Sequence, residues 1–312
     1  MTEHAPSAMS PLTAVIIVLF IGALLIHSYI AVTLLVQWLH KKTVTSIDKI
    51  VISLGISRVF LQMFSLLDLL FTIYQHSYQD PGNIMHDVID NLFILFTYCG
   101  IWLSTLFTVA FCLKIAPFNP GIFSSLKGIV LRKTVPLIVL SLVVSVSYTL
   151  MQQFFVASKS GAQNVTNVFD TSKIRANLTL FLLGNIVPTG IYCSSSALLI
   201  YSLCLHINKM RTNNTSVHVS MDAYYMTINS MAFCLVCYIF TIISNLVVLF
   251  NEFILQVLWV HVILNVFPTI HSIFLIYKTR SLRQHVTVLY DGLVHCMSLG
   301  GGSGSGVMAA VS

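Results

Sequence analysis

The sequence has few charged residues. They make up 8% of its 312 residues, whereas soluble domains carry about 25%. Hydrophobic residues make up 56%, and the mean hydropathy is +0.88. This deficit of charge excludes an ordinary soluble domain and predicts an integral membrane protein. The formal net charge of +6 is small and dispersed, so no nucleic-acid partner is expected.

Cysteine is missing from the segments expected outside the membrane, which excludes a framework of external disulfides. Six cysteines lie in apolar segments, and the seventh is Cys296 near the end of the chain. Cys234 and Cys237 have CxxC spacing, but they lie in an apolar helix with no further Cys or His nearby in the sequence. Core packing is therefore a better interpretation than a metal site or a redox pair. The sequence therefore predicts no enzyme, no cofactor and no metal site.

Long apolar runs are abundant. A bilayer core of about 30 Å needs roughly 20 apolar residues of helix, and residues 91–116 carry no charge until Lys114. We expect an all-α bundle of seven transmembrane helices within residues 1–298, a short amphipathic surface helix over 281–296, and a flexible Gly/Ser tail over 299–312 of the kind left by protein expression. The seven expected spans are about 12–39, 48–76, 86–114, 133–155, 178–207, 223–250 and 253–278.

Basic residues are distributed unevenly between the two ends of these spans. Twelve of the sixteen Lys and Arg residues fall at one end, three at the other, and Arg58 falls inside the membrane. Cytoplasmic loops carry an excess of Lys and Arg, so we expect that end and the C-terminus in the cytoplasm, the N-terminus outside, and a multi-pass protein of the plasma membrane. The sequons at Asn164 and Asn177 are then outer glycosylation sites, and Asn164 is the better placed.

The second span holds two ionisable residues at membrane depth. Arg58 lies ten residues after Asp48, about 15 Å along the axis, and such a group normally faces the bundle interior. Snorkelling to the cytoplasmic surface is the alternative. Asp68 lies ten residues further on, about 280° round the helix, so it cannot pair directly with Arg58. Ser46 and Asp48 offer N-cap chemistry for this span.

Five groups of motifs follow one another along residues 12–285. They are Leu54–Arg58; Trp102–Thr105; Phe111–Ala116 with Phe118, Ile122, Phe123, Leu126 and Lys127; Leu199–Leu203 with His206 and Met210; and Pro268, His271, Ser272, Leu275, Ile276 and Leu282–Gln284. In this order the motifs resemble those of the bitter-taste (type 2 taste) receptor family. The chain departs from the family's pattern in the first span, where Ile26–Ile30 lacks the usual Asn, and over 213–226, which lack the usual Pro and Lys.

The resemblance implies a G-protein-coupled receptor that binds a small-molecule agonist among the third, fifth, sixth and seventh spans. On apolar helices, isolated aromatic or small residues more often serve core packing, so that interpretation stays open for the candidates. The residues expected to contact the agonist are Asp90, Phe93, Ile94, Thr97, Tyr98, Phe240 and His261.

The resemblance also implies a polar core around Arg58 and a surface for a heterotrimeric G protein of the gustducin-like or other inhibitory class. The expected core partners of Arg58 are His27, Asn265, His271 and Ser272, although His27 could equally be an ordinary hydrogen-bonded core histidine. The expected G-protein contacts are Phe111, Lys114, Ile115, Phe118, Lys127, His206 and Met210.

Two alternatives to a bitter-taste receptor stay open at this point. The first is a pheromone or other chemosensory receptor with seven helices. The second is a seven-helix transporter, which would show an internal repeat or paired broken helices, and the sequence shows neither. Both would still have the lipid bilayer as their surroundings.

Overall fold

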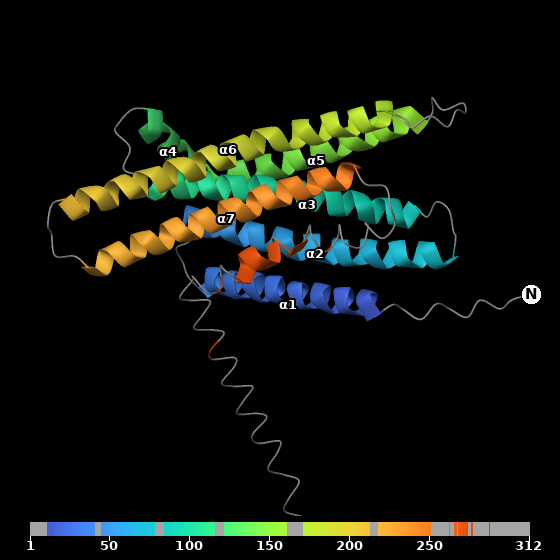
Figure 1. Ribbon diagram of the computed structural model, residues 1–312, viewed down its shortest axis with the longest axis horizontal. Coiled ribbons are helices and arrows are strands. Elements are labelled where there is room, and N and C mark those ends of the chain that lie inside the picture. The colour runs from blue at the N-terminus through green and yellow to red at the C-terminus, as the bar shows by residue number, and fades with distance from the viewer. Residues whose placement is uncertain are drawn as a thin grey trace, which may run out of the picture.

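The computed structural model describes an all-helical chain (Figure 1). It describes residues 11–40, 45–78, 84–115, 122–160, 171–212 and 218–250, and after these residues 262, 265, 266, 268–273, 276 and 287, with some side chains near helix ends excluded. The helices are α1 (Pro11–His40), α2 (Ser46–Tyr78), α3 (Ile84–Ile115), α4 (Ile122–Arg132), α5 (Thr134–Ser160), α6 (Thr171–Thr212) and α7 (His218–Phe250).

Six of these helices are long and apolar enough to cross a membrane, namely all but α4. The expectation of an all-helical membrane protein is therefore confirmed. The seventh expected span, 253–278, falls mostly outside the described residues, and those described within it, from Val262 to Ile276, are helical. The expected surface helix over 281–296 and the tail over 299–312 also lie outside the described part, apart from Thr287.

The structure contains one helix that the sequence did not predict. The eleven-residue α4 is too short and too polar to register as a span, since it carries Lys127 and Arg132. Its residue Val130 is buried with Ile50 of α2 and Ala110 of α3. This packing of one apolar side chain stabilises a helix whose own sequence signal is weak.

The start of α2 differs by one residue from the cap expected at Ser46 and Asp48. The backbone N–H of Thr45 donates to Asp48 Oδ2 at 3.1 Å, and the Asp48 N–H donates to Thr45 Oγ1 at 3.3 Å. This reciprocal pair is a capping box with Thr45 as the N-cap. Ser46 instead donates its hydroxyl to the Leu131 carbonyl at 2.6 Å, which ties α2 to the end of α4.

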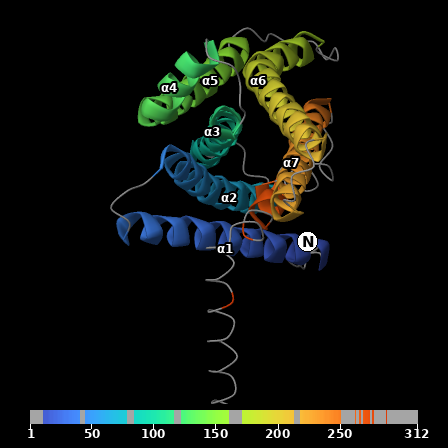
Figure 2. The same cartoon turned by 90° about the vertical axis from the view of Figure 1, so that its left-hand side faces the viewer.

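Helix α3 lies at the centre of the bundle. It contacts α2 on one side and α5 and α6 on the other, and α6 also packs against α7 (Figure 2). The outer faces of the spans are apolar: on α1, for example, Val18, Leu19 and Leu25 are each more than half exposed. Such faces suit hydrocarbon and not water, which agrees with membrane insertion.

Helices α5 and α6 approach closely at Gly184. A Cβ at this position would lie 2.5 Å from Cζ and 2.9 Å from Oη of Tyr148. Four residues later, Pro188 lies inside α6, where its ring removes the N–H that would bond the Gly184 carbonyl. The Thr105 hydroxyl of α3 donates to the Ile101 carbonyl at 2.9 Å and lies 3.3 Å from the carbonyl of Pro188, so α3 lies close to α6 at this turn.

Exposed basic side chains gather at one end of the bundle, which we call the basic end. At this end α2 begins and α3 and α6 end, and α4 is located here too. The other end, where α2 finishes and α3 begins, is called the opposite end. The exposed basic residues of the basic end are Lys49, Lys114, Lys127, Arg132, Lys133 and Lys209.

Candidate functional site

A cavity lies between α2, α3, α7 and the residues 265–268. It encloses about 50 Å³. The α3 side of the cavity follows from helical spacing, since Phe93, Thr97, Gly100, Ile101 and Ser104 recur every three or four residues on one face. The remaining lining residues are Arg58, Leu61, Tyr238, Thr241, Asn265 and Pro268.

Two of the seven residues expected to contact an agonist, Phe93 and Thr97, line this cavity. Thr97 donates its hydroxyl to the Phe93 carbonyl at 2.8 Å, so the oxygen is held against its own helix and its remaining lone pairs stay available. With Arg58 and Asn265 also at the wall, the cavity combines an aromatic ring with a few polar groups. This composition is typical of small-molecule sites.

Ile94 and Tyr98 face a different side of α3. Tyr98 is buried against Tyr148 of α5, with ring centroids 4.0 Å apart, and Asn185 of α6 donates to its hydroxyl at 3.3 Å. Ile94 packs against the same cluster. Phe240 is 54% exposed on α7 and is not among the cavity's lining residues, whereas Tyr238 and Thr241 on that helix are.

The polar core joins α1, α2 and residues 271–272. Arg58 is 5% exposed, and its Nη1 lies 2.9 Å from Nδ1 of His271 and donates to Ser272 Oγ at 3.0 Å. Because a guanidinium can only donate, His271 Nδ1 is the acceptor and its ring proton sits on Nε2. Ser272 Oγ in turn lies 2.9 Å from Nδ1 of His27. The guanidinium therefore points into the bundle and does not snorkel.

Asn265 belongs to the same level of the bundle but bonds to a different residue of α2. Its amide donates to Ser65 Oγ at 2.7 Å. Ser65 and Gln62 follow Arg58 by seven and four residues, so all three share one face of α2. Gln62 and Ser65 were not among the predicted site residues, although their spacing from Arg58 in the sequence is a signal that identifies them.

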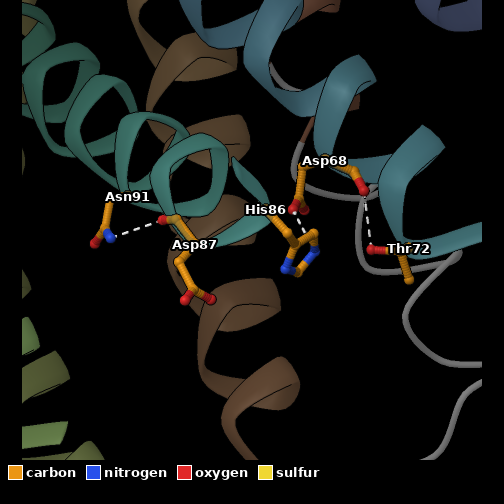
Figure 3. A network of polar contacts seen from close by, with 5 residues as sticks. All are labelled: Asp68, Thr72, His86, Asp87 and Asn91. Atoms are coloured by element: carbon orange, nitrogen blue, oxygen red, sulfur yellow. Dashed lines mark hydrogen bonds and ion pairs between the residues drawn. The ribbon is translucent and has the colours of Figure 1, made fainter. Parts of the chain in front are cut away.

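A second group of polar residues lies at the opposite end, where α2 finishes and α3 begins (Figure 3). His86 of α3 places Nε2 at 3.3 Å from Oδ1 of Asp68 on α2, a contact that is an ion pair when the imidazole is protonated. Asp68 is thus paired across to α3 and not to Arg58. Asn91 donates to the Asp87 carbonyl at 2.7 Å (Figure 3).

One expected agonist contact and both expected glycosylation sites fall at or beyond the limits of the described structure. His261 and Asn164 lie outside the described residues. Asn177 lies within the first part of α6, but its side chain is outside the described part. These residues keep the status of sequence-based predictions.

Several residues expected to contact a G protein lie together at the basic end. Phe111 and Ile115 of α3 pack with Cys112, and with Leu199 and Leu203 of α6. His206 of α6 meets the ring of Tyr224 on α7 edge-on at 5.1 Å, and Met210, one turn later, is partly buried. Lys114 and Lys127 are exposed, and Phe118 lies outside the described residues.

Two stacked tyrosines, Tyr238 and Tyr192, lie between the cavity and the part of the bundle nearer the basic end. Tyr238, in the cavity wall, stacks on Tyr192 of α6 with centroids 4.0 Å apart and planes 9° apart. Tyr192 and Ser104 line a smaller cavity that continues toward Met231 and His271. The sequence analysis missed both tyrosines because aromatic residues on apolar helices are too common to single out.

Comparison with known proteins gives a consistent result over nearly the whole chain. A family profile described as "Taste receptor protein" matches residues 5–292. Among similar proteins, taste receptor type 2 member 39 of Homo sapiens is 24% identical over 91% of this chain and 87% of its own length. Taste receptor type 2 member 20 of Pan paniscus is 27% identical over 91% of this chain and 94% of its own.

The expected family resemblance is therefore confirmed. Members of this family are multi-pass membrane receptors and not enzymes, and they respond to small molecules and couple to G proteins. The six apolar helices and the interhelical cavity fit that description. The chain belongs to the type 2 taste receptor family, the bitter-taste branch of the G-protein-coupled receptors.

Proposed function

We propose that this receptor recognises small, mainly apolar bitter-type agonists in the cavity between α2, α3, α7 and the seventh span. The observation that carries the proposal is that Phe93 and Thr97 share this cavity with the polar groups of Arg58 and Asn265. Sparse polar groups on a mainly apolar wall suit varied small molecules better than one closely matched ligand. Asp90 and His261 are proposed as further agonist contacts of the same site.

The cavity has to widen before an agonist enters. Its 50 Å³ accommodates a few water molecules, whereas pockets for drug-sized ligands are several times larger. An agonist that binds the widened arrangement more tightly shifts the population toward it. We infer that the Tyr238–Tyr192 stack transmits this change, because Tyr238 belongs to the cavity wall and Tyr192 to α6.

We propose that the basic end faces the cytoplasm, with the N-terminus outside, and that it engages a gustducin-like or other inhibitory-class G protein. The uneven distribution of Lys and Arg supports this orientation. Phe111 and Ile115 of α3, with His206 and Met210 of α6, form the proposed apolar part of the contact surface. Lys114, Phe118 and Lys127 are its proposed flanking residues.

The first experiment is agonist-dependent nucleotide exchange on purified heterotrimeric G proteins of different classes, with the receptor in nanodiscs. A bitter compound should accelerate exchange on an inhibitory-class G protein. If the compounds that activate cells expressing the chain leave exchange on every class unchanged, the receptor function is wrong and transport becomes the better hypothesis.

The second experiment compares Phe93→Ala with Phe240→Ala in a panel of chemically unrelated bitter agonists at matched surface expression. Losing the Phe93 ring from the cavity wall should reduce the potency of several agonists together, by about tenfold for a loss of about 1.4 kcal/mol of contact. Phe240→Ala is the matched control because that ring is 54% exposed and does not line the cavity. Equal effects of the two substitutions would move the agonist site to another face.

A further inference from the structure

A second cavity lies on the other side of Asn265, between α1, α2 and residues 262–270. It encloses about 130 Å³ and is lined mainly by apolar side chains, among them Phe20 and Ala23 of α1. Gln62 of α2 is one of its few polar lining residues. The expected agonist and G-protein contacts do not include any residue that lines it.

This cavity borders on the face that the spans present to the bilayer. Leu19, Val266 and Ile270 line it, and they are 59%, 38% and 39% exposed. These three side chains lie on apolar spans, so what surrounds them is hydrocarbon. A molecule dissolved in the bilayer can therefore reach the cavity without passing through the agonist cavity.

Gln62 presents an unmatched hydrogen-bond acceptor here. Its side chain is 1% exposed, and its Nε2 donates to the Phe20 carbonyl at a long 3.5 Å. Its Oε1 has no hydrogen-bond partner among the described residues. A buried acceptor without a donor is costly and is normally satisfied by a ligand or a water. The cavity thus offers an apolar surface, and the Gln62 side chain at its wall carries a buried acceptor without a donor among the described residues.

Depth and size restrict what can supply that donor. Gln62 is near the middle of the 33-residue α2, so it lies near the bilayer centre, where water is scarce. A lipid anchored at the headgroup level holds its polar groups far from this depth. In another protein, a dry cavity of about 150 Å³ binds benzene, so 130 Å³ suits a single aromatic ring.

We propose that this cavity binds a phenol-sized amphiphile that enters from the bilayer and donates its hydroxyl hydrogen to Gln62 Oε1. The ring packs on Phe20 and Ala23, and the hydroxyl satisfies the acceptor. Because Asn265 lines both cavities, an occupant here touches the wall of the agonist cavity from behind. The site is distinct from the proposed agonist site.

The test uses ¹⁹F NMR of 4-fluorophenol with the purified receptor in nanodiscs, without agonist or G protein. The line broadening should contain a saturable part that excess unlabelled phenol removes. Gln62→Leu keeps the side-chain volume but lacks the acceptor, so it should weaken this binding about three- to tenfold. Ala23→Phe should abolish it by filling the cavity. Gln152→Leu on α5, the same chemical change away from the cavity, should bind as the unmodified receptor does.

A second probe distinguishes the contribution of the acceptor to binding from the contribution of the apolar walls. 4-Fluoroanisole has the same ring but no hydroxyl donor, so Gln62→Leu should leave its binding unchanged. This comparison stays informative if Ala23→Phe fails to fold. The proposal is overturned if the unmodified receptor shows no saturable binding of 4-fluorophenol, or if Gln62→Leu binds it as tightly as Gln152→Leu does. Either result would assign the cavity to water or a lipid chain, and neither depends on the proposed agonist site.

Discussion

Arg58 contacts neutral groups. Its Nη1 lies against His271 and donates to Ser272, and neither side chain carries a negative charge. A guanidinium has several donors in a fixed plane. Neighbouring side chains must therefore be placed to match that plane, which makes the residue sensitive to conservative replacement.

Arg58→Ala should reduce the amount of folded receptor at the cell surface and its signalling. It removes the donor to His271 and Ser272, and each buried group left unmatched costs about 1 to 3 kcal/mol. Arg58→Lys should restore little, because an ammonium cannot reproduce the planar arrangement. The measurement is flow cytometry of an epitope-tagged receptor together with agonist response. Normal surface level and signalling of the Ala variant would show that the polar core is dispensable.

The sequence predicts the neighbours of Arg58 better than it predicts the ligand side of α3. Helical periodicity alone places Gln62 and Ser65 on the face of Arg58. The turn of α3 that directs Tyr98 toward Tyr148 and not toward the cavity depends on where α5 packs. No pattern within residues 91–116 contains that information, because both faces of this central helix are apolar and buried in part.

At the scale of whole helices, the crossing of α5 and α6 depends on one missing side chain. Gly184 allows the Tyr148 ring to lie against the backbone of α6, four residues before Pro188. A proline inside a helix is visible in the sequence as a site of helix distortion, but the role of the glycine is not, since only the position of α5 reveals it. Similarly, α4 forms because Val130 packs against α2 and α3.

Gly184→Ala should lower the temperature at which the purified receptor unfolds. The added methyl group overlaps the Tyr148 ring, and such overpacking typically costs about 1 to 3 kcal/mol. Gly190→Ala on the same helix is the control, since nothing lies within 4 Å of its Cβ position. That change should be neutral or stabilising by up to about 1 kcal/mol. The same unfolding temperature for both variants in detergent would contradict the close crossing.

At the scale of the molecule, the number of spans and their direction decide which loops meet the outside. Six spans come from the structure, and the seventh remains a prediction for residues 253–278. An odd number of spans places the N-terminus and the C-terminus on opposite sides of the membrane. With the basic end in the cytoplasm, the segment that contains Asn164 is outside.

Treatment of the cell-expressed receptor with an endoglycosidase should therefore lower its apparent mass. Asn164→Gln should remove most of that shift, because its sequon is the better placed of the two on the outer side. Asn213→Gln should leave the shift in apparent mass unchanged, since that residue follows α6 at the basic end. A shift that depends on Asn213 and not on Asn164 would reverse the orientation.

The hydrogen bond between Arg58 and His271 also bears on how the protein is made. These residues are 213 positions apart, and a ribosome adds about 5 to 20 residues each second, so their synthesis is separated by about 10 to 40 seconds. For that interval α2 is in or near the membrane while the partners of its arginine do not yet exist. The buried network around Arg58 is therefore complete only after His271 and Ser272 have been synthesised, late in translation.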